Sequence, residues 1–505
     1  MIHHSTRRTA PAIGPTRREA LAIGIGAAAI AASCARPTVA AEPASPFLSS
    51  DIGALKRVLV HSTKPNDHLI GKLDGGVIPS VEVDRAAMAE QQASLMRLLS
   101  ETGAEVIEVA DALEAAIEAT RPSGVFEAWL DALYPRLGAD PAAVTADMIL
   151  GRRETMQFEL GPDGNYRHRT DDARSTMWTR DSAFMTPNGL VICNAANPIR
   201  THENQLMRFL YAHSPMLKDY PVIFDGMEEG LVVEGGDAMV ADEKTMFLGV
   251  GNRTDPRVAP FLARRLGMDI VTVQTVEREF LRAGGWSGDG WIGELNLLVL
   301  HLDTYFTLVG PKHGLALPYL MEAEYAGEDP LSRYVRGARA DTGMDADDAE
   351  AALKMLKDFG AVRRYAAGTG AEERLGAMKF IDYLKADGYR ITFTGGPRPE
   401  TSDEDRFRHF MSVAYPEQRR QATNVVQAAP GRVIAYDGNP ATKAALEADG
   451  VSVDAFFARD LWSWHGGPHC LTQPLERIAA TAADIAAAKA PTTAAEATDG
   501  AAQRR

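Results

Sequence analysis

Arg57-Val58-Leu59-Val60 and Val106-Ile107-Glu108-Val109 are two short runs with the β-branched composition of buried strands. Between them, Ala86–Thr102 has apolar residues at helical spacing. A strand, a helix and a second strand in this order indicate an α/β fold. Further strands are predicted at Gly189–Ile192, Met246–Gly249, Tyr305–Leu308 and Val433–Tyr436.

Two segments interrupt the alternation of strands and helices. Residues 110–158 contain no clear strand, and the helical periodicity of Phe126–Leu133 predicts a helical insertion. Residues 321–384 are charged and rich in alanine, and they predict a second helical insertion. The C-terminal residues 479–505 are mainly alanine and threonine with a few charges, which is typical of a low-complexity tail.

The N-terminal residues have the layout of an export signal. Arg17 and Arg18 precede the apolar run Leu21–Ala32, which is shorter than the about 20 residues that a membrane-spanning helix needs. Residues 1–41 are therefore predicted to be a twin-arginine signal peptide, with a periplasmic or extracellular mature chain. A lipid anchor at Cys34 is the alternative, and we expect no other association with a membrane.

The composition narrows the class of protein. A net charge of −15 over 505 residues argues against nucleic acid and favours a cationic ligand. One of the three cysteines lies in the predicted leader, so a disulfide framework is not expected. We expect a homo-oligomer, and the sequence does not determine the number of its subunits.

One cysteine lies in a sequence suited to catalysis. Cys470 ends the run Gly466-Gly467-Pro468-His469-Cys470, in which the glycines and the proline predict a tight turn that presents the thiol to a cleft. A thiol attacks as a thiolate, and backbone N–H groups or a cationic substrate can lower its pKa. An inert buried cysteine is the alternative interpretation.

Three polar motifs supply carboxylates and a histidine. Asp181 is expected at the end of a strand or on the following loop, and a surface pair with Arg180 is the alternative. Glu234 follows a predicted buried strand and precedes two glycines, where a buried acid needs a compensating cation. His301 and Asp303 are expected on one strand, where residues two apart share a face.

These residue types suit three kinds of site. A cysteine, a histidine and an acid together resemble a cysteine protease in outline. A zinc site would draw on His301, Asp303, His465, His469 and Cys470, but no Cys-x-x-Cys or His-x-x-x-His spacing supports it. The excess of carboxylates favours a planar cation rich in N–H donors, because carboxylates bind a guanidinium through paired hydrogen bonds.

Four motifs in one order resemble a known family. They are Trp178-Thr179-Arg180-Asp181, Glu234-Gly235-Gly236-Asp237, His301-Leu302-Asp303-Thr304 and Gly466–Thr472, and they look like those of the arginine deiminases of the guanidine-modifying, or pentein, superfamily. The resemblance extends from about Ser50 to Arg477. It implies a pentein α/β propeller of five ββαβ units within residues 42–478, with the site at its centre.

The resemblance also implies roles for individual residues. Cys470 would be the nucleophile, His301 the general acid and base, and Asp181 and Asp303 the ligands of the guanidinium, with Glu234 beside His301. The positions that match substrate-binding residues are Arg200, Arg253, Ser175 and His465. Of these, the two arginines would hold the carboxylate of a free α-amino acid.

The implied activity is hydrolysis of L-arginine to citrulline and ammonia through a covalent intermediate on the cysteine, with no metal or organic cofactor. Two alternatives remain open. One is an amidinotransferase or a hydrolase of another guanidino compound. The other is an exported guanidine-binding protein without turnover, although binding alone needs no thiol.

Overall fold

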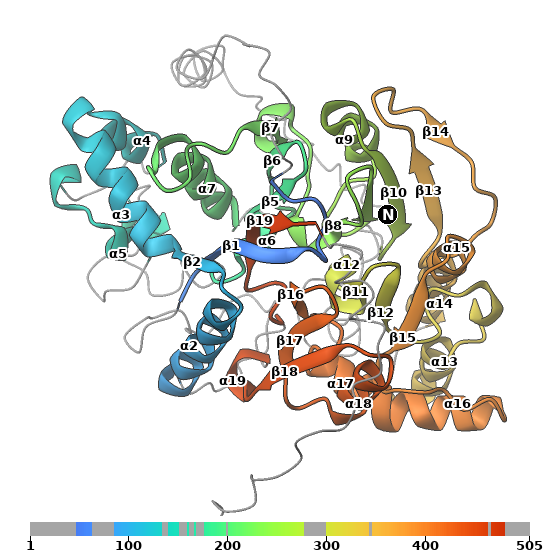
Figure 1. Ribbon diagram of the computed structural model, residues 1–505. Coiled ribbons are helices and arrows are strands. Elements are labelled where there is room, and N and C mark those ends of the chain that lie inside the picture. Colours follow the sequence, from blue (N-terminus) through green and yellow to red (C-terminus); the bar gives the residue numbers. More distant parts are fainter. Residues whose placement is uncertain are drawn as a thin grey trace, which may run out of the picture. The chain divides into compact units, whose positions relative to one another are not determined.

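The computed structural model of the protein describes ten segments of the chain (Figure 1). They are residues 47–62, 85–133, 140–150, 159–160, 166–167, 176–197, 200–276, 299–342, 346–462 and 466–479. Ser175, His465, the predicted leader and the predicted tail beyond residue 479 lie outside these segments.

Five of the described sheets share one pairing pattern, in which a middle strand has one antiparallel and one parallel neighbour. In the first sheet, β1 (Ala54–Val60) lies between β19 (Gln473–Ile478) and β2 (Glu105–Glu108). The second sheet contains β5 (Ala183–Thr186), β6 (Gly189–Ile192) and β7 (Val222–Asp225), and the third contains β8 (Ala238–Val240), β9 (Thr245–Val250) and β10 (Asp269–Gln274). The fourth contains β11 (Phe306–Gly310), β12 (His313–Ala316) and β15 (Arg390–Phe393), and the fifth contains β16 (Val426–Ala429), β17 (Arg432–Tyr436) and β18 (Ser452–Phe456). A separate pair consists of β3 (Glu159–Leu160) and β4 (Tyr166–Arg167).

Helices connect and flank these strands, which gives the α/β fold that the sequence predicts. The first helices along the described chain are α2 (Arg85–Glu101), α3 (Val109–Thr120), α4 (Val125–Leu133) and α5 (Ala146–Ile149). Later helices are α7 (Thr201–His213), α8 (Gly226–Glu229), α9 (Val258–Leu266), α16 (Asp403–His409), α17 (Tyr415–Arg419), α18 (Pro440–Ala448) and α19 (Arg459–Trp462). Among the described residues, no helix has both the length and the apolar composition needed to cross a membrane.

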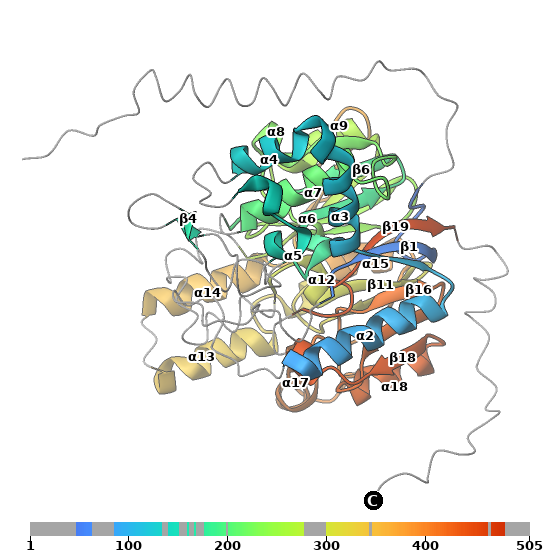
Figure 2. The same cartoon turned by 90° about the vertical axis from the view of Figure 1, so that its left-hand side faces the viewer.

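The predicted second insertion is only partly helical. It contains α13 (Pro330–Thr342) and α14 (Ala346–Asp358), which lie side by side (Figure 2), and then α15 (Phe380–Ala386). Between α14 and α15 lie β13 (Val362–Tyr365) and β14 (Glu372–Glu373). The prediction of a wholly helical segment is wrong because β13 pairs antiparallel with β10. The charged, alanine-rich composition of the segment gives no sign of this pairing.

The first sheet brings the two ends of the described chain together. β1 and β19 lie side by side in Figures 1 and 2, and Nη1 of the buried Arg477 in β19 donates to the backbone oxygen of Gly53 at 2.7 Å. β19 begins three residues after Cys470. The pairing therefore fixes the cysteine loop against the opening strand.

Candidate active site

The cysteine loop is shaped by two close approaches. A Cβ atom on Gly467 would lie 2.5 Å from the backbone oxygen of Asn424, and a Cβ on Gly466 would overlap the indole nitrogen of Trp178. Neither glycine has a positive φ angle. The glycines are therefore needed because other groups occupy the space of a side chain, while the chain turns at residues 468–471.

Cys470 is almost completely buried, with 4% of its surface exposed. Its thiol donates to Oδ2 of Asp303 at 3.4 Å, and its sulfur accepts a hydrogen bond from Nδ2 of Asn424 at 3.1 Å. Burial, followed by the charges of Asp303 and Asp181, raises the pKa of this thiol well above its usual value. The thiol of Cys470 is therefore neutral in the ligand-free site.

His301 and Asp303 lie on a helical turn, not on the predicted strand. His301 is the extended residue before α12 (Leu302–Tyr305), and Asp303 lies within that turn. The turn forms because Oδ1 of Asp237 accepts the backbone N–H of Leu302 at 3.0 Å, and the hydroxyl of Thr304 donates to the backbone oxygen of His301 at 2.7 Å. Alternation along a strand was therefore the wrong reason for placing both residues in one site.

Asp181 and Glu234 also lie on short turns. Asp181 belongs to α6 (Thr179–Ser182), which precedes β5, so the predicted position at a strand end is wrong. Glu234 precedes η4 (Gly235–Asp237), and Val233 makes only an isolated bridge with Asn194 in place of the predicted strand. η4 contacts both α6 and α12, and these contacts bring distant motifs together.

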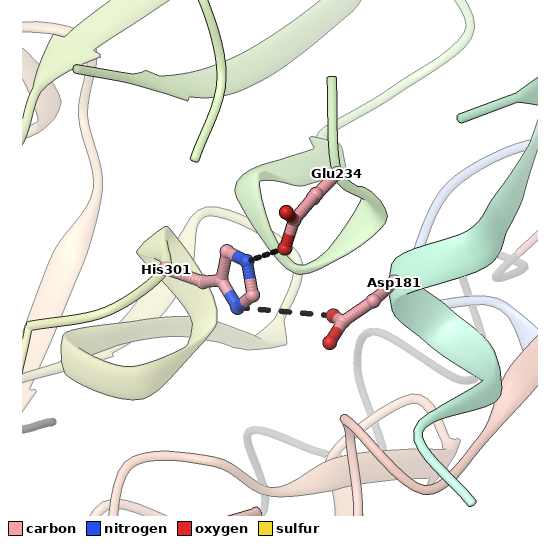
Figure 3. A group of neighbouring side chains, drawn as sticks. All are labelled: Asp181, Glu234 and His301. Carbon is pink, nitrogen blue, oxygen red and sulfur yellow. Dashed lines mark hydrogen bonds and ion pairs between the residues drawn. The ribbon is translucent and has the colours of Figure 1, made fainter. Parts of the chain in front are cut away.

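The imidazole of His301 lies between two carboxylates (Figure 3). Its Nε2 is 2.8 Å from Oε2 of Glu234, and its Nδ1 is 3.7 Å from Oδ1 of Asp181. Gly236 permits this approach, because a Cβ there would lie 2.8 Å from the imidazole and 2.9 Å from Asp181. Burial lowers the pKa of His301, but Asp181 and Glu234 outweigh it and raise the pKa to about 9. His301 is therefore a cation at neutral pH.

The two predicted substrate-binding arginines bind carboxylates of the protein. Arg200 donates from Nη1 to Oδ2 of Asp181 at 2.8 Å and makes paired hydrogen bonds to Glu203. Arg253 lies 3.5 Å from Oε1 of Glu234. Burial alone would raise the pKa of Glu234, but Arg253, His301 and then Arg200 lower it below the usual range. Glu234 is therefore ionised at neutral pH.

Three carboxylate oxygens in the site accept no hydrogen bond from the described residues: Oδ2 of Asp237 and one oxygen each of Asp181 and Asp303. Oδ1 of Asp181 and Oδ1 of Asp303 are buried and have no hydrogen-bond partner within the described part of the chain. The other oxygen of Asp303 accepts a hydrogen bond from Nδ1 of His469 at 2.8 Å. Buried unpaired acceptors are costly, so the oxygens of Asp181 and Asp303 are suited to N–H donors of a ligand.

A metal ion does not fit this donor set. Ligand atoms of Asp181, Glu234 and His301 lie within 4.8 Å of one another. Nε2 of His301 already donates to Glu234, and the guanidinium of Arg200 lies 2.8 Å from Asp181 and 3.7 Å from Glu234. A cation placed among these groups would meet two positive charges, which removes the electrostatic reason for binding it.

The structure thus brings together Cys470, His301, Asp181, Glu234, Asp303, Arg200 and Arg253. Ser175 and His465 are not among the described residues. Sequence reasoning did not select Asn424, Asp237 or Glu203 for the site, and it considered His469 only as a possible zinc ligand. The positions of His469 beside the cysteine and of Asp237 within the Glu-Gly-Gly-Asp motif were available signals, whereas nothing in the sequence marks Asn424.

A family model described as arginine deiminase matches residues 142–332 and 408–477, just over half of the chain. These two segments contain every site residue named above. The chain belongs to the arginine deiminase family. Residues 333–407, which include most of α13 and all of α14 and β13, lie outside the match.

Similar proteins of this family come from several bacteria. An arginine deiminase of Listeria monocytogenes serotype 4a is 28% identical over 319 residues, which are 62% of this chain and 64% of that protein. The alignment thus spans slightly less than two thirds of the Listeria protein. An arginine deiminase of Metamycoplasma arthritidis is 24% identical over 445 residues, which are 85% of this chain and 96% of that protein.

Two solved structures are more distant. The product-bound N-terminal domain of ArgZ, a cyanobacterial arginine dihydrolase, has a TM-score of 0.44 and 12% identity over 83% of this chain and 97% of that chain. DDAH of Pseudomonas aeruginosa in complex with citrulline has a TM-score of 0.42 and 13% identity over 83% of this chain and 99% of that chain.

Proposed function

We propose that this family member hydrolyses L-arginine to citrulline and ammonia through a covalent intermediate on Cys470. The observation that carries the proposal is the combination of a buried thiol, a protonated His301, and one carboxylate oxygen each on Asp181 and Asp303 that accepts no hydrogen bond from the described residues. Relatives named arginine deiminase support arginine as the substrate. The enzyme class would be a hydrolase of C–N bonds in linear amidines.

Binding activates the nucleophile in this scheme. N–H groups of the substrate guanidinium would donate to Oδ1 of Asp181 and Oδ1 of Asp303, which pairs both buried oxygens. The positive charge then offsets the carboxylates that raise the pKa of Cys470, and the thiol releases its proton to solvent. Fixing the guanidinium carbon beside the new thiolate removes much of the entropic barrier to attack.

The histidine moves the remaining protons. After the sulfur bonds to the guanidinium carbon, protonated His301 gives its proton to the departing nitrogen, and ammonia leaves an S-alkylthiouronium on Cys470. Neutral His301 then takes a proton from the attacking water. The second tetrahedral adduct collapses with loss of the thiolate, and the product is the ureido group of citrulline.

The carboxylate of the amino-acid substrate would be held by Arg200 and Arg253, with Ser175 and His465 as further contacts. Arg200 binds Asp181 and Glu203 in the structure, and Arg253 lies 3.5 Å from Glu234. Each arginine would therefore exchange a carboxylate of the protein for that of the substrate. Binding a free amino acid in this way includes a rearrangement of Arg200.

The test is release of citrulline and ammonia from L-arginine by the full chain, with Cys470→Ala as the control. Turnover by the wild type and none by the variant is expected. Transfer of the amidino group to an added amine would instead support an amidinotransferase. Binding of arginine without turnover by the wild type would support a guanidine-binding protein.

We also propose that the five sheets form a propeller and that the protein is exported from the cytoplasm, as the sequence predicts. The common pairing pattern of the five sheets supports a five-unit α/β propeller, which a crystal structure would test. The paired arginines Arg17 and Arg18 support export through the twin-arginine route. Replacing both with lysine should keep the protein in the cytoplasm, and unchanged export in a cell-fractionation assay would contradict this route.

A further inference from the structure

Asn424 contacts the nucleophile through both ends of its amide. Its Nδ2 donates to the sulfur of Cys470 at 3.1 Å, and its Oδ1 accepts the backbone N–H of Cys470 at 3.1 Å. Nδ2 also donates to the backbone oxygen of Asp303 at 3.0 Å. The side chain of Asn424 is fully buried. One amide thus joins the nucleophile to the turn that carries Asp303.

The orientation of this amide is fixed by its partners. The backbone N–H of Cys470 can only donate, so it must face Oδ1 of Asn424. The backbone oxygen of Asp303 can only accept, so it must face Nδ2. The group that points at the sulfur is therefore an N–H donor.

The position of Asn424 is also held from behind. The preceding residue, Thr423, accepts the hydroxyl of Thr307 on its backbone oxygen at 2.7 Å, and its own hydroxyl donates to Oε1 of Gln418 at 2.6 Å. Gly467 leaves the space that the Asn424 side chain fills. Asn424, which precedes β16 in the sequence, is thus held rigidly and is not an adaptable surface side chain.

Two hydrogen bonds favour the thiolate of Cys470, one with the backbone of Gly467 and one with the side chain of Asn424. Asp303 and Asp181 both disfavour a negative charge on Cys470. An N–H donor stabilises a thiolate without introducing a cation that would compete with a guanidinium for these carboxylates. A neutral amide thus stabilises the thiolate and leaves the carboxylates of Asp181 and Asp303 available to a guanidinium.

We propose that Asn424 is a positioning residue that stabilises the Cys470 thiolate through Nδ2 and fixes the Cys470 backbone through Oδ1. The inference deepens the proposed function and rests on it for its catalytic meaning. The contacts themselves concern the free protein, so they are testable without any substrate.

The experiment measures the rate at which iodoacetamide alkylates Cys470 of the full chain as a function of pH. Wild type is compared with Asn424→Ala, and Cys470→Ala gives the background from Cys34 and Cys193. Loss of a hydrogen bond to a charged group should move the midpoint of the profile upward by about one to two pH units. Alkylation below the midpoint should slow by about tenfold to hundredfold.

Asn204 provides a matched control. It is buried, its Oδ1 accepts the backbone N–H of Ala195 at 3.0 Å, and its Nδ2 donates to the backbone oxygen of Ser182 at 3.4 Å. Asn204→Ala also removes a buried amide but no donor to the sulfur, so its alkylation profile should match the wild type. An equal shift in both variants would assign the effect to general loosening and overturn the proposal.

A second variant covers the case in which Asn424→Ala does not fold. Asn424→Asp keeps the shape and the acceptor for the backbone of Cys470, but it replaces the donor with a third carboxylate, so its midpoint should rise further. A folded Asn424 variant with the wild-type profile would overturn the proposal. If the profile shifts while wild type fails to release citrulline, Asn424 keeps its role and the proposed function fails. If wild type releases citrulline while the profile does not shift, the proposed function stands and the role of Asn424 fails.

Discussion

Nδ1 of His469 donates a hydrogen bond to Oδ2 of Asp303 at 2.8 Å, and both side chains are completely buried. Burial and the charge of Arg180 lower the pKa of His469, so the imidazole is neutral with its proton on Nδ1. Burial would raise the pKa of Asp303, but the hydrogen bond from His469 and the positive charges of His301 and Arg180 outweigh it and lower the pKa. His469 therefore orients an ionised Asp303 and leaves Oδ1 free for a ligand.

His469→Leu should weaken substrate binding. Loss of a hydrogen bond to a charged group is worth about 1.5–3 kcal/mol, so KM for arginine is expected to rise by roughly tenfold to hundredfold. His469→Asn can still donate from its amide near the position of Nδ1, and it should retain most of the affinity. Steady-state kinetics of the two variants test this, and equal KM values in both would contradict an orienting role.

The alkaline limb of the pH–rate profile should report His301. The protonated imidazole is required as the acid, and its raised pKa in the ligand-free site means that kcat/KM should fall as the pH rises through about 9. Glu234→Gln removes one of the groups that raise this pKa, so the limb should move down toward the ordinary value of about 6.5. An alkaline limb at the same pH in wild type and variant would exclude His301 as its source.

Asp237 should make stability depend on pH. Burial raises the pKa of its carboxyl to about 7, so between about pH 4 and 7 the folded protein holds a proton that the unfolded chain has released. This group therefore favours folding less as the pH rises through that window. Asp237→Asn keeps an acceptor for the Leu302 N–H but does not titrate.

Melting temperatures of wild type and Asp237→Asn between pH 4 and 8 test this linkage. The variant should gain on the wild type as the pH rises to 7, and the difference should then stay constant. Parallel melting curves across the whole range would show that Asp237 does not carry the predicted proton.

The sequence predicts the strands better than the site turns. β1, β6, β9 and β17 follow from runs of apolar, β-branched residues, because a buried strand must be apolar along its length. The turns that carry Asp181 and His301 depend instead on contacts from distant residues, such as the carboxylate of Asp237 on the Leu302 N–H. Local patterns therefore predicted a strand for His301 where a long-range hydrogen bond forms a helical turn.

Resemblance to a family supplied the site residues that spacing could not. Cys470 and Asp303 are 167 residues apart, and no periodicity predicts that their side chains meet at 3.4 Å. Asn424 shows the limit of motif reasoning. Its contacts with Cys470 depend on how β16 and the cysteine loop pack, and its own neighbours in the sequence form no recognisable motif.

Gly467→Ala should displace the nucleophile. A Cβ at this position would lie 2.5 Å from both the backbone oxygen and Oδ1 of Asn424, so the cysteine loop or the asparagine must move. Overpacking of this kind costs about 1–3 kcal/mol of stability, and a shift of about 1 Å in a reacting group costs about a hundredfold in rate.

Gly337→Ala is the matched control, because this glycine lies in α13, is exposed and has no atom near the site of its missing Cβ. Alanine in a helix interior is favoured over glycine, so this variant should be stabilised by up to about 1 kcal/mol with unchanged kcat. Urea unfolding and steady-state kinetics of both variants distinguish the two cases. Wild-type kcat in Gly467→Ala would mean that the contact between the loop and Asn424 does not set the position of the thiol.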